Sequence, residues 1–311
     1  MFRNMFRRTL RNMLRNMFRN MFRNMTYCML SGLILTAWSS TLSAAQTAST
    51  CTFQKVQIQT DYTLVFGINN VGAIVGTYNP TSGSQAAFIR KSGVVTTIYY
   101  PGAAMTSGYG INDNGAIVGS YVMPGIGSPN YGFQWTNGTF VNLSFPGSIS
   151  TSATGINKTG QVVGSYQDSK GIFHGFKYIG GKYTTINHPN ASSTLLSTIN
   201  NNNEIAGAYT DGSNVEHGFT LQNGKFTKVD YPGGANTIVT QVNDNGVIAG
   251  TYYDSSYSTW EGFVQVNGNF TVISDPAAST ETALNGINDA NVLVGNADYS
   301  GAGFKATGCV P

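Results

Sequence analysis

Histidine is the residue type of this chain best suited to acid–base chemistry or metal binding, and only His174, His188 and His217 are present. His174 and His217 lie 43 residues apart, at the same position of an internal repeat. Two imidazoles in equivalent places can converge on one ligand or metal ion. We favour local hydrogen bonding by each imidazole and predict no metal site, because this position varies. The other copies carry Ala86, Tyr131, Glu261 and Ala302.

Carboxylates recur in the repeat, but their spacing fits turns better than metal sites. One aspartate follows a Gly-x-Tyr motif in four copies, at Asp168, Asp211, Asp254 and Asp298. We expect each to start a turn, with collective calcium binding as the alternative. The Asn-Asp-Asn-Gly segments at 112–115 and 243–246 lack the D-x-D-x-D-G spacing and the distal glutamate of a calcium loop. The sequence therefore predicts no cofactor, and calcium is the one alternative.

Aromatic side chains form a second set that could contact a ligand. Four of them precede a proline in successive copies, and three others share one loop. Aromatic faces with Asn and Asp nearby suit sugar rings, whose C–H surface stacks on them while hydroxyls take hydrogen bonds. Packing between repeats is the alternative. The predicted ligand-binding residues are Tyr100, Phe145, His188, Tyr231, Tyr253, Tyr257 and Trp260.

These residues are positioned by a motif, Gly-Ile-Asn or a close variant, that occurs six times. Its apolar second residue recurs at 68, 111, 156, 199, 242 and 287, at intervals of 43 or 45 residues. Each copy contains four short strand candidates, which we name a to d, separated by Asn-Gly and Pro-Gly turn signals. Repeats of 40–45 residues with four strands are typical of propeller blades. The sequence predicts an all-β, six-bladed β-propeller over residues 53–309.

The two ends of the array predict how the ring closes. The last copy stops after strand c at Gly303–Ala306, and an unassigned strand-d candidate, Phe53–Ile58, precedes the first copy. The N-terminal strand therefore completes the last blade in a 3+1 arrangement and removes the open edge. Cys51 and Cys309 align with the turn that joins strands c and d in other blades. We predict a disulfide between them, as expected in an exported protein.

In a propeller, strand a lines the central channel, and here the strand-a residues that precede each Gly-Ile-Asn motif include no acid and no histidine. A glycosidase needs two carboxylates that face the scissile bond. Glu281 is the nearest acid, and it has no evident partner. A serine nucleophile elbow and a phosphate-binding loop are also missing from the sequence. These observations favour a protein that is not an enzyme.

The first 45 residues have the pattern of a secretory signal peptide. A Met-Phe-Arg-Asn tandem repeat with seven arginines precedes an apolar run and the small residues Ser43-Ala44-Ala45. An uncleaved anchor is the alternative. Residues 46–52 would be a short linker. Without the leader, ten basic and 14 acidic residues give a net charge of −4, which disfavours nucleic-acid binding. We expect a secreted, extracellular or periplasmic protein that is a monomer without a membrane span.

The repeats resemble the bacterial extracellular HAF repeat family. The resemblance covers about residues 53–308 and is strongest at His174-Gly175-Phe176 and His217-Gly218-Phe219. It weakens at 86–88, 131–133, 261–263 and 302–304. The resemblance implies an exported repeat protein and brings no catalytic residues with it.

The sequence thus predicts a secreted, non-enzymatic binding or interaction module. Its partner would be carbohydrate or a cell-envelope component, bound by the face that carries the b–c and d–a loops. Two alternatives stay open: an extracellular polysaccharide hydrolase or lyase, and a structural surface protein without a small ligand.

Overall fold

A computed structural model describes residues 51–58, 62–81, 83–256, 258–298 and 301–310. The predicted signal peptide, most of the predicted linker and Tyr257 lie outside these residues. The described residues form six separate four-stranded antiparallel sheets, with no helix among them. The six-bladed propeller predicted from the repeat is therefore confirmed. No helix long and apolar enough to cross a membrane occurs within the described ranges.

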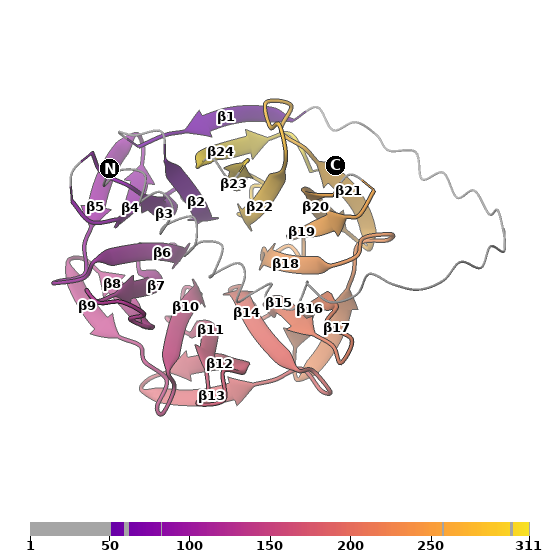
Figure 1. Ribbon diagram of the computed structural model, residues 1–311. Helices are drawn as coiled ribbons and strands as arrows, with labels where there is room; N and C mark the ends of the chain where they lie inside the picture. Colours follow the sequence, from indigo (N-terminus) through magenta and orange to yellow (C-terminus); the bar gives the residue numbers. More distant parts are fainter. Residues whose placement is uncertain (1–50, 59–61, 82, 257, 299–300, 311) are drawn as a thin grey trace, which may run out of the picture. The chain divides into compact units, whose positions relative to one another are not determined.

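The strands of the first three blades follow the repeat in chain order (Figure 1). Blade 1 contains β2 (Thr63–Ile68), β3 (Ile74–Tyr78), β4 (Ala86–Lys91) and β5 (Val94–Ile98). Blade 2 contains β6 (Met105–Ile111), β7 (Ile117–Val122), β8 (Asn130–Thr136) and β9 (Thr139–Asn142). Blade 3 contains β10 (Ser150–Ile156), β11 (Val162–Gln167), β12 (Phe173–Ile179) and β13 (Lys182–Ile186).

The remaining blades repeat this order until the last one. Blade 4 contains β14 (Ser193–Ile199), β15 (Ile205–Thr210), β16 (Glu216–Gln222) and β17 (Lys225–Val229). Blade 5 contains β18 (Thr237–Val242), β19 (Ile248–Asp254), β20 (Thr259–Val266) and β21 (Asn269–Ile273). Blade 6 contains β22 (Thr282–Ile287), β23 (Leu293–Ala297), β24 (Ala302–Thr307) and, as its outer strand, β1 (Thr52–Val56).

The last blade closes the ring as the sequence predicts. Strand β1 pairs antiparallel with β24, with Phe53 opposite Ala306, and the two strands lie side by side in Figure 1. Cys51 and Cys309 are joined in a disulfide, with 4.5 Å between their Cα atoms and 258 residues between them in the sequence. The disulfide therefore takes the place of the covalent c–d turn in this blade.

Strand a of each blade lies innermost, and successive a strands contact one another around the ring, including β22 with β2 (Figure 1). Glycine is required where they approach most closely. A Cβ on Gly110 would lie 2.6 Å from the carbonyl oxygen of Thr154 in the next blade. A meander of this kind places the a–b and c–d hairpins on one face of the ring and the b–c and d–a loops on the other.

The phenylalanine of strand c is the centre of each blade. Its exposed fraction is 0% in blades 1 to 5 and 2% in blade 6, at Phe304. The ring lies over a strand-b glycine: a Cβ on Gly119 would be 2.9 Å from Cζ of Phe133 and would overlap the carbonyl oxygen of Ser107. The Gly-x-Tyr and Gly-Phe motifs are thus two sides of one packing contact.

Candidate functional site

The asparagine of the Gly-Ile-Asn motif links neighbouring blades at the a–b end of the channel. In each blade its Nδ2 donates to the backbone carbonyl of the equivalent asparagine in the next blade, over 2.9–3.5 Å. Its Oδ1 accepts from the backbone of its own hairpin, as from Ala116 at 2.9 Å. These side chains are 2–6% exposed. The ring consists of Asn69, Asn112, Asn157, Asn200, Asn243 and Asn288.

This ring corrects one detail of the sequence interpretation. We expected the a–b hairpins to depend on residues with positive φ throughout the Asn-Asp-Asn-Gly turn. In the 112–115 turn only Gly115 has a positive φ, of 81°. Asn112 holds the turn through Oδ1 instead. The Asn-Gly pairs of the c–d hairpins do have positive φ at both residues, for example 51° and 79° at Asn223 and Gly224.

The channel mouth on this face is a funnel of about 380 Å³, including its open end. Its floor is the ring of Ile and Val side chains from the motif, and its rim carries the asparagines and the residues after them. Backbone N–H groups of one blade donate to Asp244 and Asp289 of the next at 2.7 and 2.8 Å. Burial, together with the nearby Asp244, raises the pKa of the Asp289 carboxyl. The rim groups are therefore engaged in joining blades.

No group of three or more His, Cys, Asp and Glu side chains is arranged to hold a metal ion within the residues that the structure describes. The recurrent aspartates of the b–c loops have other partners. Asp168 Oδ1 accepts from the backbone of Lys170 and Ile172, both at 2.9 Å. Asp298 instead accepts from the backbone and hydroxyl groups of Ser279 and Thr280. Burial acts to raise the pKa of Asp298, but these donors outweigh it and lower the pKa to about 2.

On the opposite face, blade 3 holds a cluster around His174. Its Nε2 lies 3.2 Å from Asp168 Oδ2, and its Nδ1 lies 3.2 Å from Asn187 Oδ1. The backbone N–H of Ile172 and the His174 contact lower the pKa of Asp168. The imidazole and the carboxylate are 21% and 29% exposed, so both are fixed and reachable from solvent.

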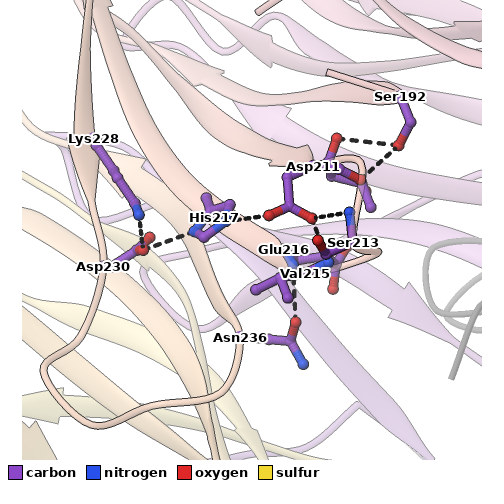
Figure 2. A network of polar contacts seen from close by, with 10 residues as sticks. Ser192, Asp211, Ser213, Val215, Glu216, His217, Lys228, Asp230 and Asn236 are labelled. Atoms are coloured by element: carbon purple, nitrogen blue, oxygen red, sulfur yellow. Dashed lines mark hydrogen bonds and ion pairs between the residues drawn. The ribbon is translucent and has the colours of Figure 1, made fainter. Parts of the chain in front are cut away.

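Blade 4 repeats this cluster with one change (Figure 2). His217 Nε2 lies 3.3 Å from Asp211 Oδ2, but Nδ1 lies 2.7 Å from Asp230 Oδ2, where blade 3 has an asparagine. Lys228 Nζ lies 2.8 Å from the same Asp230 oxygen, which raises the pKa of the lysine. The pKa of Asp211 is lowered, first by the backbone N–H of Val215 and then by His217. Both predictions, local bonding by the histidines and turn initiation by the aspartates, are met here.

Blade 5 keeps the position but changes its chemistry. Glu261 replaces the histidine and accepts from the Ser274 hydroxyl at 2.7 Å. Tyr253 and Trp260, two of the predicted ligand-binding residues, lie nearby with ring centroids 5.5 Å apart, and both are half-buried. Tyr257, from the same loop, is not among the described residues.

The four aromatic residues predicted in the d–a loops stack on strand-b tyrosines of the following blade. Tyr100 lies on Tyr121 and His188 lies on Tyr209, with centroid distances of 3.5 and 3.6 Å and interplanar angles of 5°. Phe145 and Tyr231 stack in the same way at 3.7 Å, on Tyr166 and Tyr252. One face of each ring is thus covered by protein, which is the packing alternative; their role in ligand binding stays a prediction.

Sequence reasoning missed how these stacks place the histidine clusters. Tyr166 also lies against His174 and Tyr209 against His217, with centroids 5.1 and 5.0 Å apart. Each cluster therefore sits at the end of a stack of three rings, the third contributed by the d–a loop. The signal was present in the Gly-x-Tyr motif, whose tyrosine recurs at 121, 166, 209 and 252.

Two glutamates near this face are buried. Glu281, the acid nearest to the channel in the sequence prediction, is 7% exposed. Glu216 precedes the histidine of blade 4 and is 6% exposed. Burial raises its pKa to about 8, and its Oε2 atom has no hydrogen-bond partner.

Comparison with known proteins supports the fold and leaves the family open. No protein-family model matches the sequence, and no curated protein is detectably similar to it. Among solved structures, TolB from Acinetobacter baumannii is 12% identical, with a TM-score of 0.54, over 76% of this chain and 63% of that one. The SapL1 lectin in complex with alpha methyl fucoside is 11% identical, with a TM-score of 0.50, over 76% and 87%. AofleA from Arthrobotrys oligospora is 13% identical, with a TM-score of 0.48, over 80% and 84%. At these identities the likeness concerns the fold alone.

Proposed function

We propose that this protein is an exported, non-enzymatic carbohydrate-binding propeller that uses the face of its b–c and d–a loops. One observation carries the proposal: an imidazole held by a carboxylate at the end of an aromatic stack occurs at the same place on two adjacent blades. Neither cluster is needed to build a blade, because blades 1 and 6 have alanine at the histidine position.

The chemistry of the clusters suits sugar hydroxyls. Carboxylates and amide oxygens accept hydrogen bonds, and an imidazole can donate or accept. The groups in both clusters are between 15% and 34% exposed, so a ligand can reach them without unfolding a loop. Their positions are fixed by hydrogen bonds before a ligand arrives, which reduces the entropy lost on binding. A pair of equivalent sites would add avidity for a polymer with repeated sugars.

Three further observations support the proposal. The SapL1 lectin shows that a propeller of similar fold can bind a fucoside. The Cys51–Cys309 disulfide is typical of proteins made for oxidising compartments, which agrees with the signal peptide expected in residues 1–45. Membership of the HAF repeat family belongs to the same proposal, since that family resembles this chain in its His-Gly-Phe motifs and is extracellular.

A glycan array followed by calorimetry on the oxidised protein tests the proposal, with product analysis on the same samples. We expect saturable binding without release of sugar products. His174→Ala and His217→Ala should each weaken binding, whereas Lys182→Ala, at an exposed c–d hairpin on the other face, should not. Release of products would favour the hydrolase alternative. Binding to no glycan would favour the structural surface protein.

A further inference from the structure

The clusters of blades 3 and 4 differ at the residue that faces Nδ1 of the histidine. This residue is Asn187 in blade 3 and Asp230 in blade 4, each two to three residues before the proline that ends strand d. The rest of the arrangement is shared: an aspartate from the b–c loop faces Nε2, and a strand-b tyrosine lies beside the ring. The two blades therefore differ at the one partner that decides which proton the imidazole must carry.

A neutral imidazole has one N–H donor and one acceptor nitrogen, whereas an imidazolium has two donors. An ionised carboxylate can only accept. His217 has a carboxylate oxygen at each ring nitrogen, at 2.7 and 3.3 Å, so only the imidazolium satisfies both contacts. His174 has an amide at Nδ1, and an amide can present its NH₂ group to a neutral imidazole. His174 is thus satisfied in either form.

The charges around His217 favour the same form. Asp211 faces it from the b–c loop, and Asp230 and Lys228 face it from the end of β17 (Figure 2). Tyr209 lies beside its ring, and His188 stacks on the far side of Tyr209. With His217 protonated, two carboxylates are balanced by two cations. Without that proton, a lone pair faces a carboxylate and the cluster has one uncompensated negative charge.

Asp211 connects this proton to the loop. Its Oδ2 faces His217, while its Oδ1 accepts from the backbone N–H groups of Ser213 and Val215 at 2.7 and 3.0 Å. His217 therefore bridges the loop at 211–215 to Asp230 at the end of strand β17 (Figure 2). Losing the bridging proton would release the loop from the outer strand.

We propose that His217 is a protonation-dependent clamp: its imidazolium locks the 211–215 loop to Asp230, and the lock opens as the pH rises and the proton is lost. His174 lacks this dependence because of Asn187. Where the clusters bind a ligand as proposed above, binding at blade 4 weakens at high pH while binding at blade 3 does not. The consequence for binding rests on the proposed function; the clamp itself does not.

The clamp is tested without a ligand, on the full oxidised protein with ¹⁵N-labelled histidine. Ring ¹⁵N shifts across pH 5 to 9 should show both nitrogens of His217 protonated at pH values where His174 is already neutral. Asp230→Asn, which copies blade 3, should abolish this difference. Asn187→Asp, which copies blade 4, should confer the same behaviour on His174. Loss of the proton from both histidines at the same pH, or no effect of either exchange, would overturn the proposal.

Amide hydrogen exchange supplies the loop readout. Exchange at Ser213 and Val215, relative to the equivalent amides of Lys170 and Ile172 in blade 3, should rise as His217 loses its proton, and should be independent of that proton in Asp230→Asn. A constant ratio across the titration would contradict the clamp. If Asp230→Asn fails to fold, Asn187→Asp at the exposed blade 3 cluster still decides the question. A failed glycan screen would leave these outcomes unchanged, so the two proposals fail separately.

Discussion

Asn288 donates from Nδ2 to the backbone carbonyl oxygen of Asn69 over 3.1 Å, although 219 residues separate them in the sequence. This contact joins blade 6 to blade 1 and completes the ring of asparagines around the channel. Its geometry matches the five contacts between blades adjacent in the chain. The recurring motif therefore serves closure at two levels, because its asparagine holds its own hairpin and the neighbouring blade at once.

Replacing Asn288 with alanine should destabilise the propeller by about 2–4 kcal/mol, because Asn69 O and the N–H of Val292 would lose their partner in a buried place. Urea unfolding of the oxidised protein measures the loss. Asn114→Ala is the matched control, since Asn114 is an asparagine of the same turns with exposed contacts. An equal loss for the two variants would show that burial in the ring contributes nothing special.

Removing the disulfide, by Cys51→Ala together with Cys309→Ala, should lower the free energy of unfolding by up to about 5 kcal/mol according to the chain-entropy model for a loop of this length. The loss should be felt first in blade 6, since β1 is held there only by pairing with β24 and by side chains such as Phe53, whose ring lies against Phe304. Hydrogen exchange resolved by residue measures it. Protection lost evenly in all six blades would argue against a local role for the bridge.

The repeat made the fold predictable because one motif encodes local turns and contacts between blades with a fixed period. The spacing of Ile68, Ile111 and their equivalents predicted six blades, and the alignment of Cys51 with a c–d turn predicted the disulfide. The site was harder to predict. Whether a tyrosine such as Tyr231 faces solvent or a neighbour depends on contacts between blades, which no single repeat reveals. The Asn187/Asp230 difference gains meaning only when His174 and His217 are known to face them.

Tyr231→Ala should cost about 2 kcal/mol of stability, because the ring stacks on Tyr252 at 3.7 Å and meets the edge of Phe270 at 5.4 Å. Tyr231→Phe keeps both ring contacts and should be nearly neutral. Thermal unfolding of the two variants makes the comparison. A loss of glycan binding in Tyr231→Ala that exceeds its loss of stability, measured well below the melting temperature, would instead support the direct ligand contact predicted from the sequence.

Glu216→Gln should stabilise the protein, and increasingly so as the pH rises. The folded state holds the Glu216 proton up to about pH 8, whereas the unfolded chain releases it near the ordinary value of 4.5. Below pH 4.5 both states are protonated and the residue costs nothing. Between pH 4.5 and 8 the cost of keeping or burying the charge grows, and above pH 8 it is constant, on the order of 4 kcal/mol.

The variant should therefore match the original protein at pH 4 and exceed its stability at pH 8 to 9. Glutamine already occupies the equivalent position in blade 1, where Gln85 donates to the Ser107 hydroxyl at 2.9 Å, so the exchange fits the fold. Urea unfolding across pH 4 to 9 measures the difference, with Glu204→Gln at the a–b hairpin of the same blade as a control for the lost charge. A gain that does not depend on pH would mean that Glu216 is not protonated in the folded state.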